Sequence, residues 1–172
     1  MSLSALSSLS ALSRWDNVIS LSVIGLYALP CFLALVTHNL RELFPLVGML
    51  LTVGLNETLK YAVIGERSPR PAGARDCNLW VSDGPQAGRP GMPSGHSAHV
   101  SFVTGYYLQR LTDASTLSPM TRSLLAAALL LYALLVMLSR YTKCCHTVPQ
   151  LLTGSALGLL VSVAFRSVVL RP

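Results

Sequence analysis

An uncharged, almost wholly apolar stretch from Val18 to Val36 limits what this chain can fold into more than any other feature. An α-helix needs about 20 apolar residues to cross the hydrocarbon core of a bilayer, and this stretch is close to that length. The proline inside it, Pro30, would only kink the helix. The sequence therefore predicts a membrane helix here.

The composition of the whole chain agrees with a membrane protein. Of its 172 residues, 52% are hydrophobic and 12% are charged, which is too apolar for a typical soluble domain. Further apolar segments predict membrane helices at residues 44–65, 95–111 and 122–138, and from the end of a loop at 139–150 to about residue 169. We therefore expect an all-α fold, a polytopic bundle of about five transmembrane helices that forms one domain over residues 17–172.

Residues 1–16 precede the first span and repeat the sequence Ser-Leu-Ser-Ala-Leu. Leucines three residues apart, with no charge before Arg14, fit a short helix at the membrane interface, and disorder fits them equally well. A cleaved signal peptide would have a basic start, which this segment lacks. An organelle transit segment is a weaker interpretation, because the stretch holds a single arginine.

The charge balance favours anionic partners. The chain has 13 basic and 7 acidic residues, a formal charge of +6, which suits membrane lipids or phosphorylated substrates. No basic patch interleaved with aromatic residues is present, so nucleic acid is not an expected partner. The four cysteines lack the spacing of a zinc site, so no metal is expected. Cys77 would lie on the same side of the membrane as Cys144 and Cys145, and a disulfide is open if that side is oxidising.

The segment Gly91–Ser97, at the start of the third expected span, has the features of an anion site. Pro93 disfavours helix before it, Ser94 is a favoured N-cap, and Gly95 leaves the free amides of the first turn open to a ligand. His96 would place an imidazole beside the bound group, which suits general acid catalysis. The alternative is an ordinary helix start with a surface histidine.

Polar residues also occur inside the second expected span. Asn56, Glu57 and Lys60 lie in its second half, where a polar group exposed to lipid is costly and marks a function unless it serves helix packing. Lys60 and Arg67 are seven residues apart, or two helical turns, so they would share nearly the same side. Two cations stacked in this way are suited to bind one anion.

A second polar stretch, Ser139–Gln150, precedes the last expected helix and contains Arg140 and His146. Counting the spans places this loop on the same face of the membrane as the loop at about 60–97. Basic residues do not identify which side of the membrane that face meets. His99, further along the third span, is expected to pack rather than react. The chemical residues of the two loops are expected to converge at one site.

These residues resemble the motifs of the type 2 phosphatidic acid phosphatase superfamily. Its second motif, Pro-Ser-Gly-His, is matched at residues 93–96. Its third motif is Ser-Arg, five residues, His, three residues and Asp. Ser139, Arg140 and His146 match it, with Gln150 in the place of the aspartate.

The first motif of the superfamily, Lys followed after six residues by Arg-Pro, is matched imperfectly. Lys60 and Arg67 have the expected separation, but Ser68 follows, whereas Arg70 is followed by Pro71 and lies three residues too late. Arg67 is favoured as the motif arginine because it would lie on the same side of the helix as Lys60. Arg70 is favoured because a proline follows it, as in the motif. Either arginine therefore remains a candidate phosphate ligand.

Within the superfamily, the chain is most similar to the dolichyl diphosphatase branch, over about residues 55–160. The two share Leu-Asn-Glu at 55–57, Gly-Met-Pro-Ser at 91–94, and the pattern of His-Thr and a later Gln at 146–150. This resemblance implies a multi-pass membrane phosphatase of the endoplasmic reticulum that serves protein N-glycosylation, with its site facing the lumen. The implied substrate is dolichyl diphosphate, a polyprenyl diphosphate, from which one phosphate is removed.

The resemblance also implies chemical roles. His146 would attack phosphorus to give a phosphohistidine, and His96 would protonate the departing lipid phosphate. No metal or other cofactor is required. Gln150 has two open roles, either to orient His146 through Nδ1 or to cap the last helix with Thr147. The expected phosphate ligands are Lys60, Arg67 or Arg70, Ser94, Gly95 and Arg140.

Two alternatives to a diphosphatase stay open. One is a phosphatase of lipid monophosphates such as phosphatidate. The other is a catalytically inactive relative that binds lipid phosphate. Two features favour it, namely Gln150 in the place of the aspartate and the imperfect first motif. Phosphate release from polyprenyl diphosphate and from phosphatidate separates these functions.

Overall fold

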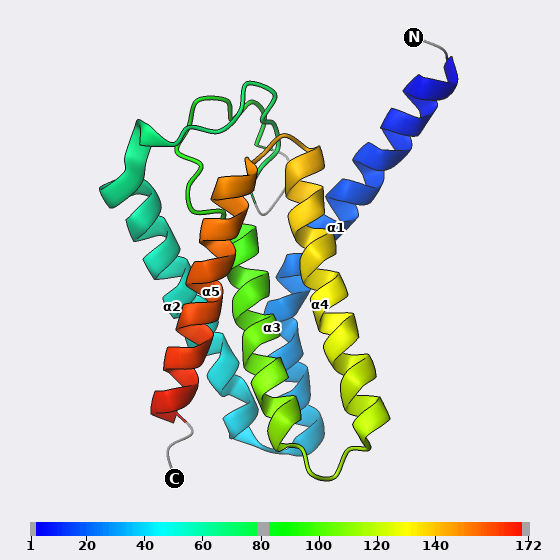
Figure 1. Cartoon of the computed structure of the whole chain (residues 1–172), viewed down its shortest axis with the longest axis vertical. Helices are drawn as coiled ribbons and strands as arrows, with labels where there is room; N and C mark the ends of the chain where they lie inside the picture. The colour runs from blue at the N-terminus through cyan, green and yellow to red at the C-terminus, as the bar shows by residue number, and fades with distance from the viewer. Residues whose placement is uncertain (1–2, 79–82, 170–172) are drawn as a thin grey trace.

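The computed structural model describes residues 3–78 and 83–169, and within these ranges it contains helices and no strand. The long helices run along a common direction as a bundle (Figure 1). They are α1 (Leu3–Thr37), α2 (Phe44–Thr58), α3 (Gly95–Asp113), α4 (Pro119–Thr142) and α5 (Val148–Val169). The all-α fold predicted from the apolar segments is therefore confirmed.

Four segments of the described chain are long and apolar enough to cross a bilayer. They are Trp15–Thr37, Leu40–Arg67, Pro119–Thr142 and Val148–Val168. Their outer faces expose large apolar side chains, among them Phe32, Leu50, Leu131 and Leu160. Such faces are typical of surfaces that meet lipid.

Helix α3, the remaining expected span, contacts α2, α4 and α5 from the interior of the bundle (Figure 1). Its Ser97 and Ser101 are buried among the other helices, so they lower its hydropathy without facing lipid. Helix α5 packs closest to it, because a Cβ atom added at Gly158 would lie 2.8 Å from Phe102 N. The four-residue spacing of Gly154 and Gly158 in an apolar segment is typical of close helix packing of this kind.

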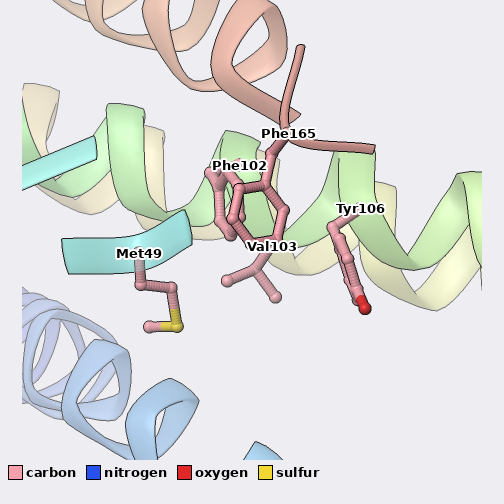
Figure 2. Close-up of a cluster of buried hydrophobic side chains, with 5 residues drawn as sticks. All are labelled: Met49, Phe102, Val103, Tyr106 and Phe165. Carbon is pink, nitrogen blue, oxygen red and sulfur yellow. The ribbon is translucent and has the colours of Figure 1, made fainter. Parts of the chain in front are cut away.

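The apolar core is built around α3. Figure 2 shows Phe102, Val103 and Tyr106 of α3 together with Met49 of α2 and Phe165 of α5. The rings of Phe102 and Phe165 meet edge to face with centroids 5.9 Å apart, a favoured aromatic geometry. A second cluster joins α1, α3 and α4 and consists of Val23, Val100, Ala133 and Val136. Because α3 contributes to both clusters, its first turn is held in a fixed place.

Helices α1 and α4 are longer than the sequence predicted. Helix α1 begins at Leu3, so residues 3–16 continue the first span as one helix, which projects from the bundle in Figure 1. Residues 1–2 of the predicted N-terminal segment lie outside the described residues. Helix α4 begins at Pro119 because Ser118 accepts a hydrogen bond from the Thr121 N–H at 3.1 Å, with proline at the first helical position.

The two loops that carry the motifs lie at the same end of the bundle. Figure 1 shows the segment between α2 and α3 next to the link between α4 and α5. The α1–α2 and α3–α4 connections and the end of α5 lie at the opposite end. The topology obtained by counting spans is thus the observed one.

The long loop between α2 and α3 is held at several points. The Arg70 N–H donates to the carbonyl of Arg89 at 2.8 Å. A disulfide joins Cys77 of this loop to Cys145 in the link between α4 and α5, and the neighbouring Cys144 is exposed. The disulfide that the sequence left open is therefore formed with Cys145.

Candidate active site

The first turn of α3 presents its backbone to a cavity. Ser94 is the N-cap, and its side chain accepts a hydrogen bond from the Ser97 N–H. The Ser94 N–H itself donates to the carbonyl of Gln150 at 3.0 Å, which ties the start of α3 to α5. Gly95 and His96 line the cavity. The free amides and the dipole at this end of α3 favour an anion.

The cavity has a volume of about 200 Å³ and is bounded by α1, α2, α3 and both loops. It brings together predicted residues from separate parts of the chain: Lys60, Arg70, Gly95, His96 and His146. The other residues that line it are Val23, Tyr27, Val53, Glu57, Cys77, Asn78 and His99. The chemical groups of the two loops therefore meet at one place.

A larger groove of about 520 Å³ lies between α1, α3 and α4, away from both loops. Leucine is the most frequent residue in its walls, and its two charged residues, Glu42 and Arg110, form an ion pair with each other. None of the predicted site residues lines it. The smaller cavity is therefore the candidate active site.

The structure places Arg70, and not Arg67, beside Lys60. Arg70 lines the cavity and is 7% exposed, whereas Arg67 is exposed and outside the lining. The expectation that Arg67 shares a face with Lys60 was wrong. Helix α2 gives way to a π-helical turn at Leu59–Ile64 and then to a 3₁₀ turn at Gly65–Arg67. The π-helical turn is wider and the 3₁₀ turn is tighter than an α-helical turn. The angle around the helix axis between Lys60 and Arg67 therefore differs from the one that two regular α-helical turns would give.

Arg70 has donors available for an anion. Its Nε and Nη1 are buried and have no hydrogen-bond partner among the described residues. Burial lowers the pKa of Arg70 from its ordinary value, but an arginine side chain remains charged in proteins. A buried charge is unfavourable unless it is paired. An anion in the cavity would supply the missing partner.

Lys60 reaches the same part of the cavity from the π-helical turn. Its ammonium donates to Glu57 Oε1 at 2.9 Å, and Asn56 Nδ2 donates to that oxygen at 3.0 Å. A Cβ atom added at Gly95 would lie 3.9 Å from Lys60 Nζ. The ammonium therefore lies next to the first turn of α3, where the backbone amides are free.

The two candidate catalytic histidines, His96 and His146, line the cavity from different segments. His96 lies in the first turn of α3, and its Nε2 is buried without a partner among the described residues. His146 precedes α5, and its Nδ1 lies 3.3 Å from Gln150 Oε1. Because an amide oxygen can only accept, Nδ1 of His146 carries the proton and Nε2 keeps a lone pair. This is the tautomer that an imidazole nucleophile needs at Nε2.

Gln150 makes the contacts that both of its open roles require. Its Oε1 accepts from His146 and from the Thr147 N–H at 3.1 Å, the second being a capping contact at the start of α5. Its Nε2 donates to Ser68 Oγ at 3.0 Å and to the carbonyl of Pro69 at 2.9 Å. These partners decide which end of the amide is oxygen. One side chain thus joins His146, α5 and the long loop.

The pKa of His146 is lowered from its ordinary value of 6.5 to about 3. Burial is the largest cause, followed by the positive charges of Arg70, Arg140 and Lys60. An imidazole with such a pKa is neutral at pH 7, so its Nε2 lone pair is available for attack. An anion bound among the cations would oppose part of the shift.

Two predicted phosphate ligands, Arg140 and Ser94, lie behind the cavity and not in its lining. Arg140 donates from Nη1 to Ser20 Oγ at 2.7 Å and from Nη2 to the carbonyl of Cys77. These bonds join α4, α1 and the long loop, while Nε has no partner among the described residues. Arg140 therefore supports the wall of the site and adds positive charge behind it.

The sequence did not predict the side of the cavity that α1 forms. Tyr27 lies in an uncharged span whose pattern carries no chemical signal. His99 was expected to pack, yet it lines the cavity and hydrogen-bonds to Tyr27. Its place one turn after His96, on the same face of α3, was the available signal.

Comparison with known proteins connects this geometry to a family. The family model described as the PAP2 superfamily matches residues 41–171. Dolichyldiphosphatase 1 of Rhinolophus ferrumequinum is 30% identical over 145 residues, which cover 78% of this chain and 57% of the relative. Dolichyldiphosphatase 1 of Mus musculus is 30% identical over 155 residues, which cover 84% and 60%. The chain spans about three fifths of the length of these curated relatives.

A solved bacterial structure shares the fold. The transmembrane PAP2 type phosphatidylglycerolphosphate phosphatase from Bacillus subtilis superimposes with a TM-score of 0.60 over 97% of this chain and 87% of its own. At 19% identity this likeness concerns the fold alone. The family match extends from before α2 to the end of α5 and includes every residue assigned to both loops. The chain belongs to the PAP2 superfamily.

Proposed function

We propose that this protein is an integral membrane phosphatase that removes the terminal phosphate of a polyprenyl diphosphate such as dolichyl diphosphate. One observation carries the proposal: Arg70 and His96 hold buried nitrogens at a single cavity, and these nitrogens have no partner among the residues that the structure describes. Buried polar groups are normally hydrogen-bonded, so these nitrogens suit an anionic ligand. The relatives named Dolichyldiphosphatase 1 support the choice of substrate.

The terminal phosphoryl group would lie among Lys60, Arg70 and the Gly95 amide. Two cations and a helix N-terminus would stabilise the charge on its nonbridging oxygens in the transition state. Arg140 would add positive charge from behind, and Ser94 would hold the turn in place. Because side chains neutralise the charge, the proposed mechanism uses no metal ion or other cofactor.

In the first step, His146 Nε2 attacks the terminal phosphorus, and an N–P bond forms as the bridging P–O bond breaks. His96 takes up a proton as the anion binds beside it and gives that proton to the bridging oxygen of the departing lipid monophosphate. A water molecule then attacks the phosphohistidine and returns a proton to His96. Phosphate is released and His146 is restored. Gln150 accepts from Nδ1 throughout, so the attack comes from Nε2.

The proposed lipid-phosphatase domain is the transmembrane unit of residues 17–172, with membrane lipids around its outer faces. The disulfide between Cys77 and Cys145 joins the two loops of the site, and Cys77 lines the cavity. Disulfides persist in oxidising compartments, which supports a site that faces the lumen of the endoplasmic reticulum.

Phosphate release by the detergent-purified protein tests the proposal. The wild type should hydrolyse a polyprenyl diphosphate faster than phosphatidate, at the same rate with and without a chelator. Rapid quenching with substrate radiolabelled in the terminal phosphate should label the wild type but not His146→Asn. The matched control is His38→Asn, because His38 is exposed, far along the chain from both loops, and has a positive φ of 51° that asparagine tolerates.

Other results of these experiments would each contradict a specific part of the proposal. No turnover of either lipid would contradict an enzyme and favour binding of lipid phosphate. Faster release from phosphatidate would assign lipid monophosphates as substrates. Loss of activity in chelator would overturn the metal-independent mechanism, and labelling of His146→Asn would overturn His146 as the nucleophile.

A further inference from the structure

The cavity continues past the residues assigned to the terminal phosphate. Helix α3 runs away from the loops, so His99, three residues after His96, lies about 4.5 Å deeper along the helix axis. Tyr27 of α1 lines the same cavity with His99. The mechanism described above uses neither of these polar side chains.

Tyr27 and His99 are hydrogen-bonded to each other in the cavity wall. His99 Nδ1 lies 3.0 Å from the carbonyl of Gly95, and because a carbonyl only accepts, this nitrogen carries the proton. Nε2 of His99 therefore accepts from the Tyr27 hydroxyl. The pair connects α1 to the turn that presents the Gly95 amide.

Next to this pair the lining becomes apolar. Val23 of α1 and Val53 of α2 line the cavity together with Tyr27. Helix α2 runs toward the loops, so Val53 lies deeper in the bundle than Lys60. An apolar chain attached to a headgroup in the cavity would thus have an apolar surface to follow toward the bilayer.

Resting on the function proposed above, we propose that Tyr27 and His99 form a subsite for the second phosphoryl group of a lipid diphosphate, the group that leaves with the chain. When it binds, the hydroxyl hydrogen of Tyr27 rotates from His99 to a phosphoryl oxygen. His99 takes up a proton from solvent beside the anion and donates from Nε2 to the same group.

The charged side chains of the cavity agree with separate places for the terminal phosphate and the second phosphoryl group. Lys60 and Arg70 lie at the end that holds the terminal phosphate, and the carboxylate of Glu57 is paired with Lys60. Among the described residues that line the cavity, the permanent cations are Lys60 and Arg70, whereas Tyr27 and His99 add hydrogen-bonding groups that carry no permanent charge. Such a subsite suits a leaving group, since a lipid monophosphate held by a permanent cation would dissociate more slowly.

The variant Tyr27→Phe removes one oxygen atom and tests the subsite. kcat/KM is measured for a polyprenyl diphosphate and a polyprenyl monophosphate of equal chain length, so that only the second phosphoryl group differs. We expect the variant to lower the diphosphate value about tenfold and the monophosphate value less than about twofold, since one hydrogen bond to a charged group is lost. The matched control is Tyr132→Phe, because the Tyr132 hydroxyl bonds to Ser22 of α1 at 2.8 Å outside the cavity. It should change neither value.

Binding measurements separate the subsite from the phosphatase function. Inorganic pyrophosphate should raise the Tm of the wild type more than orthophosphate does, and Tyr27→Phe should lose that difference. A wild type with this preference but no turnover would overturn the phosphatase proposal alone. Equal losses for both lipids, no loss for either, or equal stabilisation of the wild type by both anions would overturn the subsite.

Discussion

Gln150 Oε1 lies 3.3 Å from Nδ1 of His146, while Gln150 Nε2 donates to the carbonyl of Pro69 at 2.9 Å. One amide therefore meets a donor on the imidazole and an acceptor on the long loop. A carboxylate, which the third motif has at this position, accepts hydrogen bonds but does not donate them. It would satisfy His146 and leave the loop without a partner. The way the loop is attached thus gives a physical reason for glutamine here.

We expect Gln150→Glu to lower the free energy of unfolding by about 1–3 kcal/mol, because a carboxylate oxygen would face the carbonyls of Ser68 and Pro69. Chemical denaturation in detergent measures this loss. Gln150→Met would lose the contact to His146 as well, so it should reduce turnover in addition to stability. An unfolding curve of Gln150→Glu that matches the wild type would show that the loop does not depend on this amide.

The low pKa of His146 predicts that stability falls in acid. The folded pKa is about 3 and the ordinary value is 6.5. Between these values the unfolded chain binds more protons than the folded one, so the free energy of unfolding rises with pH through this window and levels off above it. From pH 7 to pH 5 the expected loss is about 2 kcal/mol.

Unfolding in detergent at the two pH values measures this dependence. The variant His146→Asn should show a shallower dependence than the wild type, because the group that titrates is removed. His38→Asn, at an exposed position, should keep the wild-type slope. Equal slopes for His146→Asn and the wild type would contradict a buried, neutral imidazole at this position.

The disulfide between Cys77 and Cys145 predicts sensitivity to reductant. It closes a loop with a sequence separation of 68, and cross-links of this kind typically stabilise by about 2–4 kcal/mol. Cys77→Ser should lower stability by that amount and also lower turnover, because Cys77 lines the cavity and Cys145 precedes His146. Cys31→Ser and Cys144→Ser are the matched controls, since both cysteines are free and exposed. Stability and turnover that reductant leaves unchanged would argue against this tether.

Much of the fold could be predicted because it depends on local properties of the sequence. The apolar length of Val18–Val36 is enough to predict a membrane helix, and the spacing of Gly154 and Gly158 indicates a close helix contact. The N-cap at Ser94 follows equally from a few neighbouring residues. In each case the sequence signal lies within one helix or one turn.

The rest depends on geometry that the sequence does not record. Lys60 and Arg70 line the same cavity where α2 gives way to a π-helical turn, a change of helix type without a clear sequence signal. Tyr27 reaches the cavity because of where α1 packs beside α3, which is a long-range property. Cys145 is bonded and Cys144 is not, because adjacent residues point in different directions and Cys144 has a positive φ of 55°.

The pair Arg70 and Arg67 offers a direct test of the site, because the same substitution can be made inside and outside the cavity. Arg70→Ala should lower kcat/KM for a lipid diphosphate by about 100-fold or more, since it removes from the phosphate site a cation and two donors that have no partner within residues 3–78 and 83–169. Arg67→Ala should stay within about threefold of the wild type, as expected for an exposed charge.

Arg70→Lys should recover only part of the lost activity, because an ammonium keeps the charge but lacks the planar fork of donors. Similar unfolding curves for the three variants would assign the losses to the site and not to the fold. A larger loss for Arg67→Ala than for Arg70→Ala would contradict the geometry at the end of α2. It would mean that α2 continues as a regular α-helix, so that Arg67 lies on the same side as Lys60 and is the second cation of the site.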